Sequence, residues 1–134
     1  MTNAIDQPIV TTIFNHPRDI GVLMIRSKSR KELDQILKSI KDILSENYRD
    51  KLDNILLFGS YARNSQRNES DIDIAVVLDG EFDKYEEVEK MVDLTNDISL
   101  KYDVMISILP MTNKEYLNGN YSIFKNIRQE EIVI

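Results

Sequence analysis

LFGSYARNSQRNESDIDIAVVL, the stretch Leu57–Leu78, decides the fold. An apolar run stops at Gly59, mostly polar residues follow, and a second apolar run then carries two acids, Asp71 and Asp73. Side chains alternate along a strand, so these two acids point to one face with their Cα atoms about 7 Å apart, while the isoleucines beside them point into the core. Acids on a largely buried strand cost free energy unless a cation or another partner compensates them.

The segments around this stretch predict a small α/β fold. Ser29 and Glu32 match a capping box, and apolar residues follow at helical spacing from Leu33 to Leu44. The other expected elements are strands at Asn54–Phe58, Asp71–Leu78, Tyr102–Leu109 (ended by Pro110) and Glu131–Ile134, a long helix over Lys84–Leu100 and a short helix over Tyr121–Arg128. This alternation favours one small mixed sheet with helices packed on it.

Composition narrows the class of protein. The 134 residues fit a single domain, and no apolar run is long enough to span a membrane, so no membrane partner is expected. No secretory signal is visible, and the absence of cysteine excludes disulfides and thiolate metal sites, so we expect a cytoplasmic protein. The net charge of −6 disfavours extended nucleic-acid binding but is compatible with a small Mg²⁺–nucleotide ligand or a basic protein partner.

The residue types at the two strand ends suit a metal-bound nucleotide. Two ionised carboxylates side by side repel each other, and a divalent cation between them removes that cost. Mg²⁺ prefers oxygen ligands and usually keeps waters and substrate phosphates. Gly59 allows close backbone approach, and Ser60 opens a short helix whose free amides suit a phosphate. Asp103, early in the expected third strand, would add a third carboxylate and allow two metals about 3.5–4 Å apart.

Each of these residues also has a purely structural interpretation. Asp71 and Asp103 could simply begin strands, Asp73 could be an exposed edge acid, and Gly59 could end a strand at a turn. Arg63, which follows the turn, could pair with a triphosphate or be a solvated helix arginine. The fixed spacing in a strand–turn–helix context favours the metal–nucleotide site.

The motif Gly59-Ser60, ten residues, Asp71-x-Asp73 resembles that of the nucleotidyltransferase superfamily related to DNA polymerase β, which implies its palm-like fold. The segments LFGSYAR and SDIDIAVVL resemble the minimal (MNT) members, of the MntA type, which are encoded beside HEPN-domain toxins. The resemblance predicts a minimal nucleotidyltransferase domain over residues 29–134 and an N-terminal extension of unknown role over residues 1–28. One departure is Asn64, where the family usually has glycine; asparagine tolerates a left-handed backbone better than most residues.

The resemblance implies a Mg²⁺-dependent protein adenylyltransferase that transfers AMP from ATP to a tyrosine hydroxyl of its HEPN ribonuclease toxin and thereby acts as the antitoxin. It implies catalytic, metal-ligating carboxylates at Asp71, Asp73 and Asp103, of which Asp103 would activate the hydroxyl. The residues expected at the ATP phosphates are Gly59, Ser60 and Arg63.

Two other functions are compatible with the sequence. The chain could neutralise its toxin by occlusion without catalysis, or it could transfer a nucleotide to a small molecule or an RNA end. The presence of all three acids, Asp71, Asp73 and Asp103, argues that catalysis has not been lost, because an inactive site has no need of carboxylates that repel one another. A chain of this length also leaves no room for the extra substrate-binding domain that small-molecule enzymes usually carry.

Overall fold

Four strands form one mixed sheet in the order β3-β2-β1-β4 in the computed structural model, which describes residues 28–67 and 70–134. β1 pairs antiparallel with β2 and β4, whereas β2 and β3 are parallel. The elements are α2 (Arg30–Tyr48), η3 (Arg49–Lys51), β1 (Leu52–Phe58), α3 (Gly59–Ala62), β2 (Ile72–Leu78), α4 (Lys84–Tyr102), β3 (Ile106–Thr112), α5 (Asn113–Asn118), α6 (Ser122–Glu130) and β4 (Ile132–Val133). The predicted α/β class is confirmed. Residues 1–27 of the predicted N-terminal extension lie outside the described residues, so the domain division stays a prediction.

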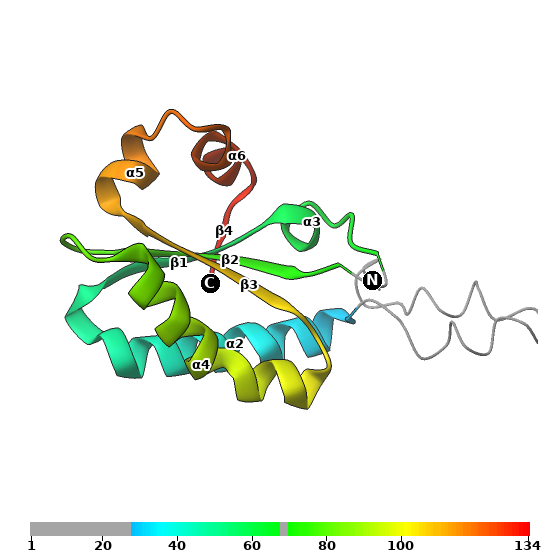
Figure 1. Cartoon of the computed structure of the whole chain (residues 1–134). Helices are drawn as coiled ribbons and strands as arrows, with labels where there is room; N and C mark the ends of the chain where they lie inside the picture. The colour runs from blue at the N-terminus through cyan, green and yellow to red at the C-terminus, as the bar shows by residue number, and fades with distance from the viewer. Residues whose placement is uncertain (1–27, 68–69) are drawn as a thin grey trace, which may run out of the picture.

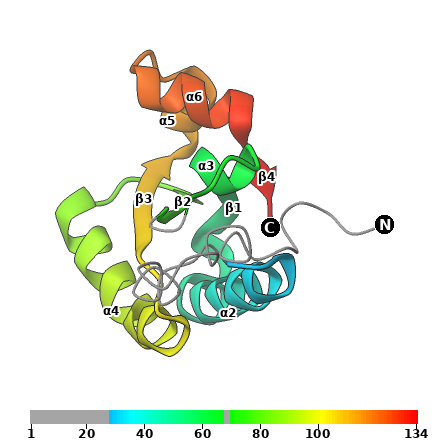
Figure 2. The same cartoon turned by 90° about the vertical axis from the view of Figure 1, so that its right-hand side faces the viewer.

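The first helix starts where the capping box predicts. The Ser29 hydroxyl accepts a hydrogen bond from the Glu32 N–H, and the Glu32 carboxylate accepts one from the Ser29 N–H. The predicted apolar stripe is buried at Leu33, Ile36, Ile40 and Leu44. With α4, this helix covers one face of the sheet, and α5 and α6 cover the other (Figures 1 and 2).

The second strand is buried from both faces, which explains its nearly continuous apolar sequence. Ile72 and Ile74 belong to a core cluster with α2 and α4, whereas Ala75 and Val77 pack with Phe124 and its neighbours of α6. The side chains of β2 therefore alternate between two cores. Odd-numbered positions, including Asp73, face α6.

The third strand is displaced from its predicted position. It spans Ile106–Thr112 rather than Tyr102–Leu109, because α4 continues to Tyr102. Pro110 lies within the strand instead of ending it; β3 is an edge strand, where a residue without an N–H is tolerated. The final strand is confirmed at Ile132–Val133.

The helix α5 was not predicted. α5 begins at a second capping box, in which Thr112 and Glu115 bond each other reciprocally, and this motif is visible in the sequence. In the part of the chain that the structure describes, no helix combines the length and the apolar character needed to cross a membrane.

Replacing a residue at the centre of this core tests the two-faced sheet. Because Ile74 is fully buried, Ile74→Ala should lower the free energy of unfolding by about 2–5 kcal/mol, measured by urea denaturation. Val92→Ala, on the half-exposed side of α4, is the control and should change it by less than about 1 kcal/mol. Equal losses in the two variants would contradict the assignment of Ile74 to the core.

Candidate active site

The site forms where β1 ends beside the start of β2. Phe58, the last residue of β1, pairs with Asp73 across the antiparallel ladder, and Gly59 follows with a φ of 75°. A Cβ atom added to Gly59 would lie 2.1 Å from Oδ2 of Asp73. The left-handed backbone favours glycine, and the close approach leaves no room for a Cβ atom unless the Asp73 carboxylate moves, so the motif glycine brings the end of β1 directly against the motif acid.

The two motif acids lie on the face of the sheet that α6 covers. Asp71 is exposed and Asp73 half-buried, whereas Ile72 and Ile74 on the opposite face are fully buried. Burial and the neighbouring Asp71 carboxylate raise the pKa of Asp73, Arg63 lowers it, and Glu130 raises it further. The pair is therefore a place of excess negative charge, as the sequence predicts.

The turn after β1 is a single helical turn. Arg63 caps α3 and its N–H donates to the Gly59 carbonyl. Asn64 then adopts a φ of 56°, which confirms that it takes the left-handed conformation expected of the family glycine. The N–H of Ser65 returns to the Ser60 carbonyl at 2.8 Å, so the chain folds back over the half-buried Ser60.

A glutamate from the other end of the chain completes the turn. The Gly59 N–H donates to Oε2 of Glu130 at 3.2 Å, and Nη1 of Arg63 lies 2.8 Å from Oε1 of the same carboxylate. Gly59 and Arg63, both expected at the ATP phosphates, are thus brought together. Sequence patterns did not indicate Glu130, because it lies 71 residues from Gly59 along the chain and forms no local motif with it.

A serine occupies the position that the parallel neighbour strand offers to the acids. Ser107 of β3 is in register with Asp73, and its hydroxyl donates to Oδ2 of Asp71 at 3.2 Å. The sequence did not indicate Ser107, because the predicted strand starts at Tyr102, four residues before the observed start at Ile106. That shift put Asp103 second in the strand, the position that Ser107 occupies in the structure. The hydroxyl supplies a third oxygen beside the carboxylate pair.

Asp103 does not join Asp71 and Asp73, contrary to the expectation that the third strand would deliver it. It caps the C-terminus of α4 in a left-handed conformation and is exposed, and α4 packs on the face opposite the acid pair. The physical reason is the longer helix, which places Asp103 three residues before β3 begins.

The residues present fit Mg²⁺ brought with a nucleotide rather than a metal held by protein alone. Within residues 28–67 and 70–134, no group of three or more acids or histidines is arranged to hold a metal ion. Mg²⁺ is commonly bound by one or two carboxylates, with phosphates and waters in its remaining positions. Asp71 and Asp73, which share one face and carry excess negative charge, match that pattern.

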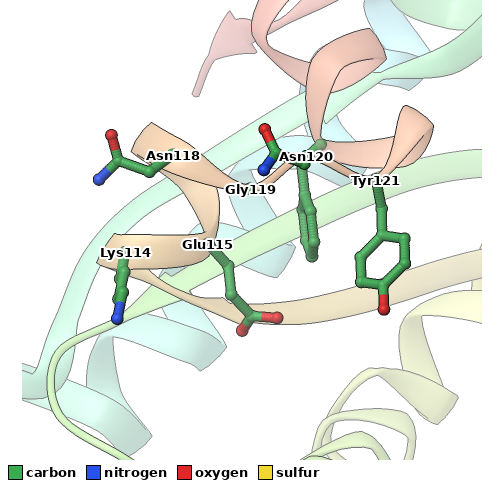
Figure 3. Close-up of a pocket in the computed structure, with 7 residues that line it drawn as sticks. Lys114, Glu115, Asn118, Gly119, Asn120 and Tyr121 are labelled. Carbon is green, nitrogen blue, oxygen red and sulfur yellow. The ribbon is translucent and has the colours of Figure 1, made fainter.

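A cavity of about 560 Å³ lies apart from these residues, between α5 and the start of α6 (Figure 3). Its lining residues are Lys114, Glu115, Asn118, Gly119, Asn120, Tyr121 and Phe124. Glu130 ends the same helix roughly 12 Å further along, given a rise of about 1.5 Å per residue. None of the predicted site residues lines this cavity, so it does not mark the acid pair.

Comparison with known families agrees with this geometry. Residues 38–127, more than half of the chain, match the family described as Polymerase beta, Nucleotidyltransferase. The chain belongs to this family. The prediction of a nucleotidyltransferase with the corresponding fold is therefore confirmed.

Individual relatives and structures extend the likeness. Two proteins of Methanocaldococcus jannaschii named as protein adenylyltransferases are 40% identical over 90 residues (67% of this chain, 88% of the relative) and 35% identical over 103 residues (75% and 96%). A chain from a toxin–antitoxin crystal structure with AMP-PNP has 22% identity and a TM-score of 0.53, covering 72% of this chain and 69% of its own. A chain from a mutant MntA–HpeT toxin–antitoxin has 23% identity and a TM-score of 0.52, with 73% and 70% covered. At these identities, the structural likeness supports the fold alone.

All six residues predicted for the nucleotidyltransferase site fall within the matched segment, whereas Glu130 and β4 follow it. The structure brings together Gly59, Arg63 and Asp73, with Ser60 and Asp71 adjacent to them in the chain. Their chemical roles stay predictions that the following variants test.

Gly59→Ala should disrupt the site more than a positive φ alone explains. Gly80 has a φ of 83° with nothing within 4 Å of an added Cβ, so Gly80→Ala measures the backbone strain, about 1–2 kcal/mol. Gly59→Ala adds the collision with Asp73 and should cost more free energy of unfolding than the control and abolish Mg²⁺-dependent ATP binding. Denaturation and calorimetric titration measure the two effects. Equal behaviour of the two variants would refute the close approach.

The raised pKa of Asp73 predicts a pH-dependent gain in stability for Asp73→Asn. Above that pKa the folded protein carries an ionised carboxylate disfavoured by burial and by Asp71, and the unfolded chain does not. The variant should therefore unfold at a higher temperature in EDTA at neutral pH, and its advantage should vanish as the pH falls below the ordinary aspartate pKa of 3.8. Asp97→Asn, at an exposed acid of α4, is the control. A loss of stability at neutral pH would contradict the prediction.

Proposed function

We propose that this nucleotidyltransferase transfers AMP from ATP to a tyrosine hydroxyl of a cognate HEPN-domain ribonuclease and so acts as its antitoxin in the cytoplasm. The observation that carries the proposal is the closed arrangement of Gly59, Asp73 and Arg63 at one end of the sheet. Supporting it, relatives that are up to 40% identical are named as protein adenylyltransferases. Structures with the same fold come from toxin–antitoxin complexes, one of them with the ATP analogue AMP-PNP.

In this proposal, Asp71 and Asp73 would hold Mg²⁺ together with the triphosphate. When bound, the ion would supply positive charge to offset the charge that develops on the departing pyrophosphate. Ser107 orients Asp71 by donating to its Oδ2, which leaves the other carboxylate oxygen toward the ligand. Ser60 offers its hydroxyl to a phosphate oxygen, and Arg63 offers guanidinium N–H groups.

The transfer forms a bond from the acceptor oxygen to the α-phosphorus and breaks the bond from that phosphorus to the pyrophosphate oxygen. The hydroxyl proton must go to a base, and Asp103 lies at the end of α4 rather than at the sheet. The proposal therefore gives Asp103 no role in catalysis. Asp71 and Asp73 are the predicted site carboxylates on the face of the sheet that α6 covers. In this proposal they are the candidates both for binding the metal and for accepting the proton.

Mass spectrometry of the partner tests the chemistry. Incubation of a cognate HEPN protein with the purified chain, ATP and Mg²⁺ should increase the intact mass of that protein by one AMP residue per transfer. EDTA should abolish the increase, because without a divalent cation the two carboxylates repel the triphosphate. If the partner binds but gains no mass under these conditions, AMP transfer is refuted and neutralisation of the toxin by occlusion remains.

Two matched acid-to-amide variants separate catalysis from occlusion and test the placement of Asp103. Asp73→Asn keeps the side-chain volume and should still bind the partner in a pull-down, yet lose AMP transfer and fail to rescue cells that express the toxin. Asp103→Asn should retain both transfer and rescue. Full rescue by Asp73→Asn would refute the catalytic role, and loss of transfer in Asp103→Asn would show that Asp103 reaches the reacting groups.

A further inference from the structure

One carboxylate joins the last residue of α6 to both ends of the turn that follows β1. Oε2 of Glu130 accepts the Gly59 N–H at 3.2 Å, and Oε1 lies 2.8 Å from Nη1 of Arg63. Gly59 and Arg63 are one helical turn apart, and the Arg63 N–H donates to the Gly59 carbonyl at 3.1 Å. Glu130 therefore spans α3 and restrains a backbone group and a side chain at once.

The backbone that carries Glu130 is held on both sides of the contact. Before it, Phe124 and Ile127 of α6 are buried against the sheet. After it, β4 pairs with β1 through Leu56↔Val133 and Leu57↔Ile132. Because β1 leads directly into Gly59, the glutamate and the turn are anchored to the same strand.

The ion pair between Glu130 and Arg63 adds little stability. The Arg63 side chain is 50% exposed and that of Glu130 22% exposed, and ion pairs with an exposed member contribute little to the free energy of folding. Glu130 also adds a negative charge close to Asp73, because both side chains lie against Gly59. A third acid placed beside two that already repel each other points to a role in the site.

The contact leaves donors for a ligand. The guanidinium of Arg63 has five N–H groups in a planar fork, of which Nη1 faces Glu130, so the remaining donors stay available. The Gly59 N–H is already bonded to Glu130, so this glycine contributes its shape and not a free donor. Holding one edge of a guanidinium fixes the direction in which its other edge points.

We propose that Glu130 is a positioning residue for nucleotide binding: it holds the Gly59 turn and the Arg63 guanidinium where the triphosphate of ATP meets them. The inference rests on the proposed nucleotide site and extends it to a residue outside the matched family segment. It concerns the binding of the phosphates and does not depend on the identity of the acceptor.

Calorimetric titration of Glu130→Gln with Mg²⁺–ATP tests the proposal. The amide keeps the volume but loses the charge and places an N–H₂ group against one of two donors, so the Kd for Mg²⁺–ATP should rise about tenfold or more. The Kd for adenosine, which has no phosphates, should not change, whereas a general structural defect would weaken both ligands. Glu131→Gln is the matched control, because that neighbour accepts from the Tyr116 hydroxyl and does not contact the turn.

Hydrogen exchange without nucleotide provides a second readout. Amides of Gly59–Arg63 should exchange faster in Glu130→Gln than in the wild type and in Glu131→Gln. When Arg63 is already replaced by Gln, the further change Glu130→Gln should weaken Mg²⁺–ATP binding much less than it does in the wild type, because the two residues act as a unit.

The outcomes separate this inference from the proposed function. Unchanged or tighter Mg²⁺–ATP binding by Glu130→Gln would overturn the inference, and tighter binding would identify the carboxylate as a competitor of phosphate. A wild-type chain that binds no Mg²⁺–ATP would overturn it together with the nucleotide site. Normal Mg²⁺–ATP binding by the wild type without AMP transfer would refute only the proposed function, and the result with Glu130→Gln would still decide the role of Glu130.

Discussion

The contact between Gly59 and Asp73 is the constraint on which the rest of the site depends. Any side chain at position 59 would be strained, because φ is positive there and a Cβ atom would overlap the Asp73 carboxylate unless that side chain moved. The antiparallel pairing of Phe58 with Asp73 sets this approach, since it aligns the end of one strand with the start of the next. The spacing of the motif thus reflects a physical arrangement: Gly59 and Ser60 open the helical turn of α3, and Asp71 directly precedes β2.

The double burial of β2 supports that arrangement. One set of its side chains packs with α2 and α4 and the alternate set with α6, so the strand cannot slip by one residue without moving acids into a core. The two cores therefore hold the carboxylate pair on the α6 face. The same alternation that leaves Ile72 fully buried leaves Asp71 exposed to a ligand.

Sequence reasoning was sufficient for features with local causes. The capping box at Ser29, the alternation through Asp73 and the left-handed position at Asn64 each follow from neighbouring residues. Asp103 was misplaced because the end of a long helix depends on tertiary packing: α4 runs to Tyr102, two residues beyond the predicted end at Leu100, and a difference of this size is common at helix ends. Ser107 and Glu130 contact the site across the sheet and across the chain, and no local pattern encodes such contacts.

Under the proposed function, the charges of the site explain how an acidic protein could accept an anionic nucleotide. Asp71, Asp73 and Glu130 place three carboxylates around the turn against one guanidinium, that of Arg63. A bare triphosphate would be repelled by this excess of negative charge, whereas a divalent cation between the phosphates and the acid pair reverses the local balance. In the proposed function, the cation would then be a condition for nucleotide binding as well as for chemistry. The same excess of negative charge also disfavours binding of a nucleic-acid backbone, because its many phosphates would be repelled by the net charge of −6 on the whole chain.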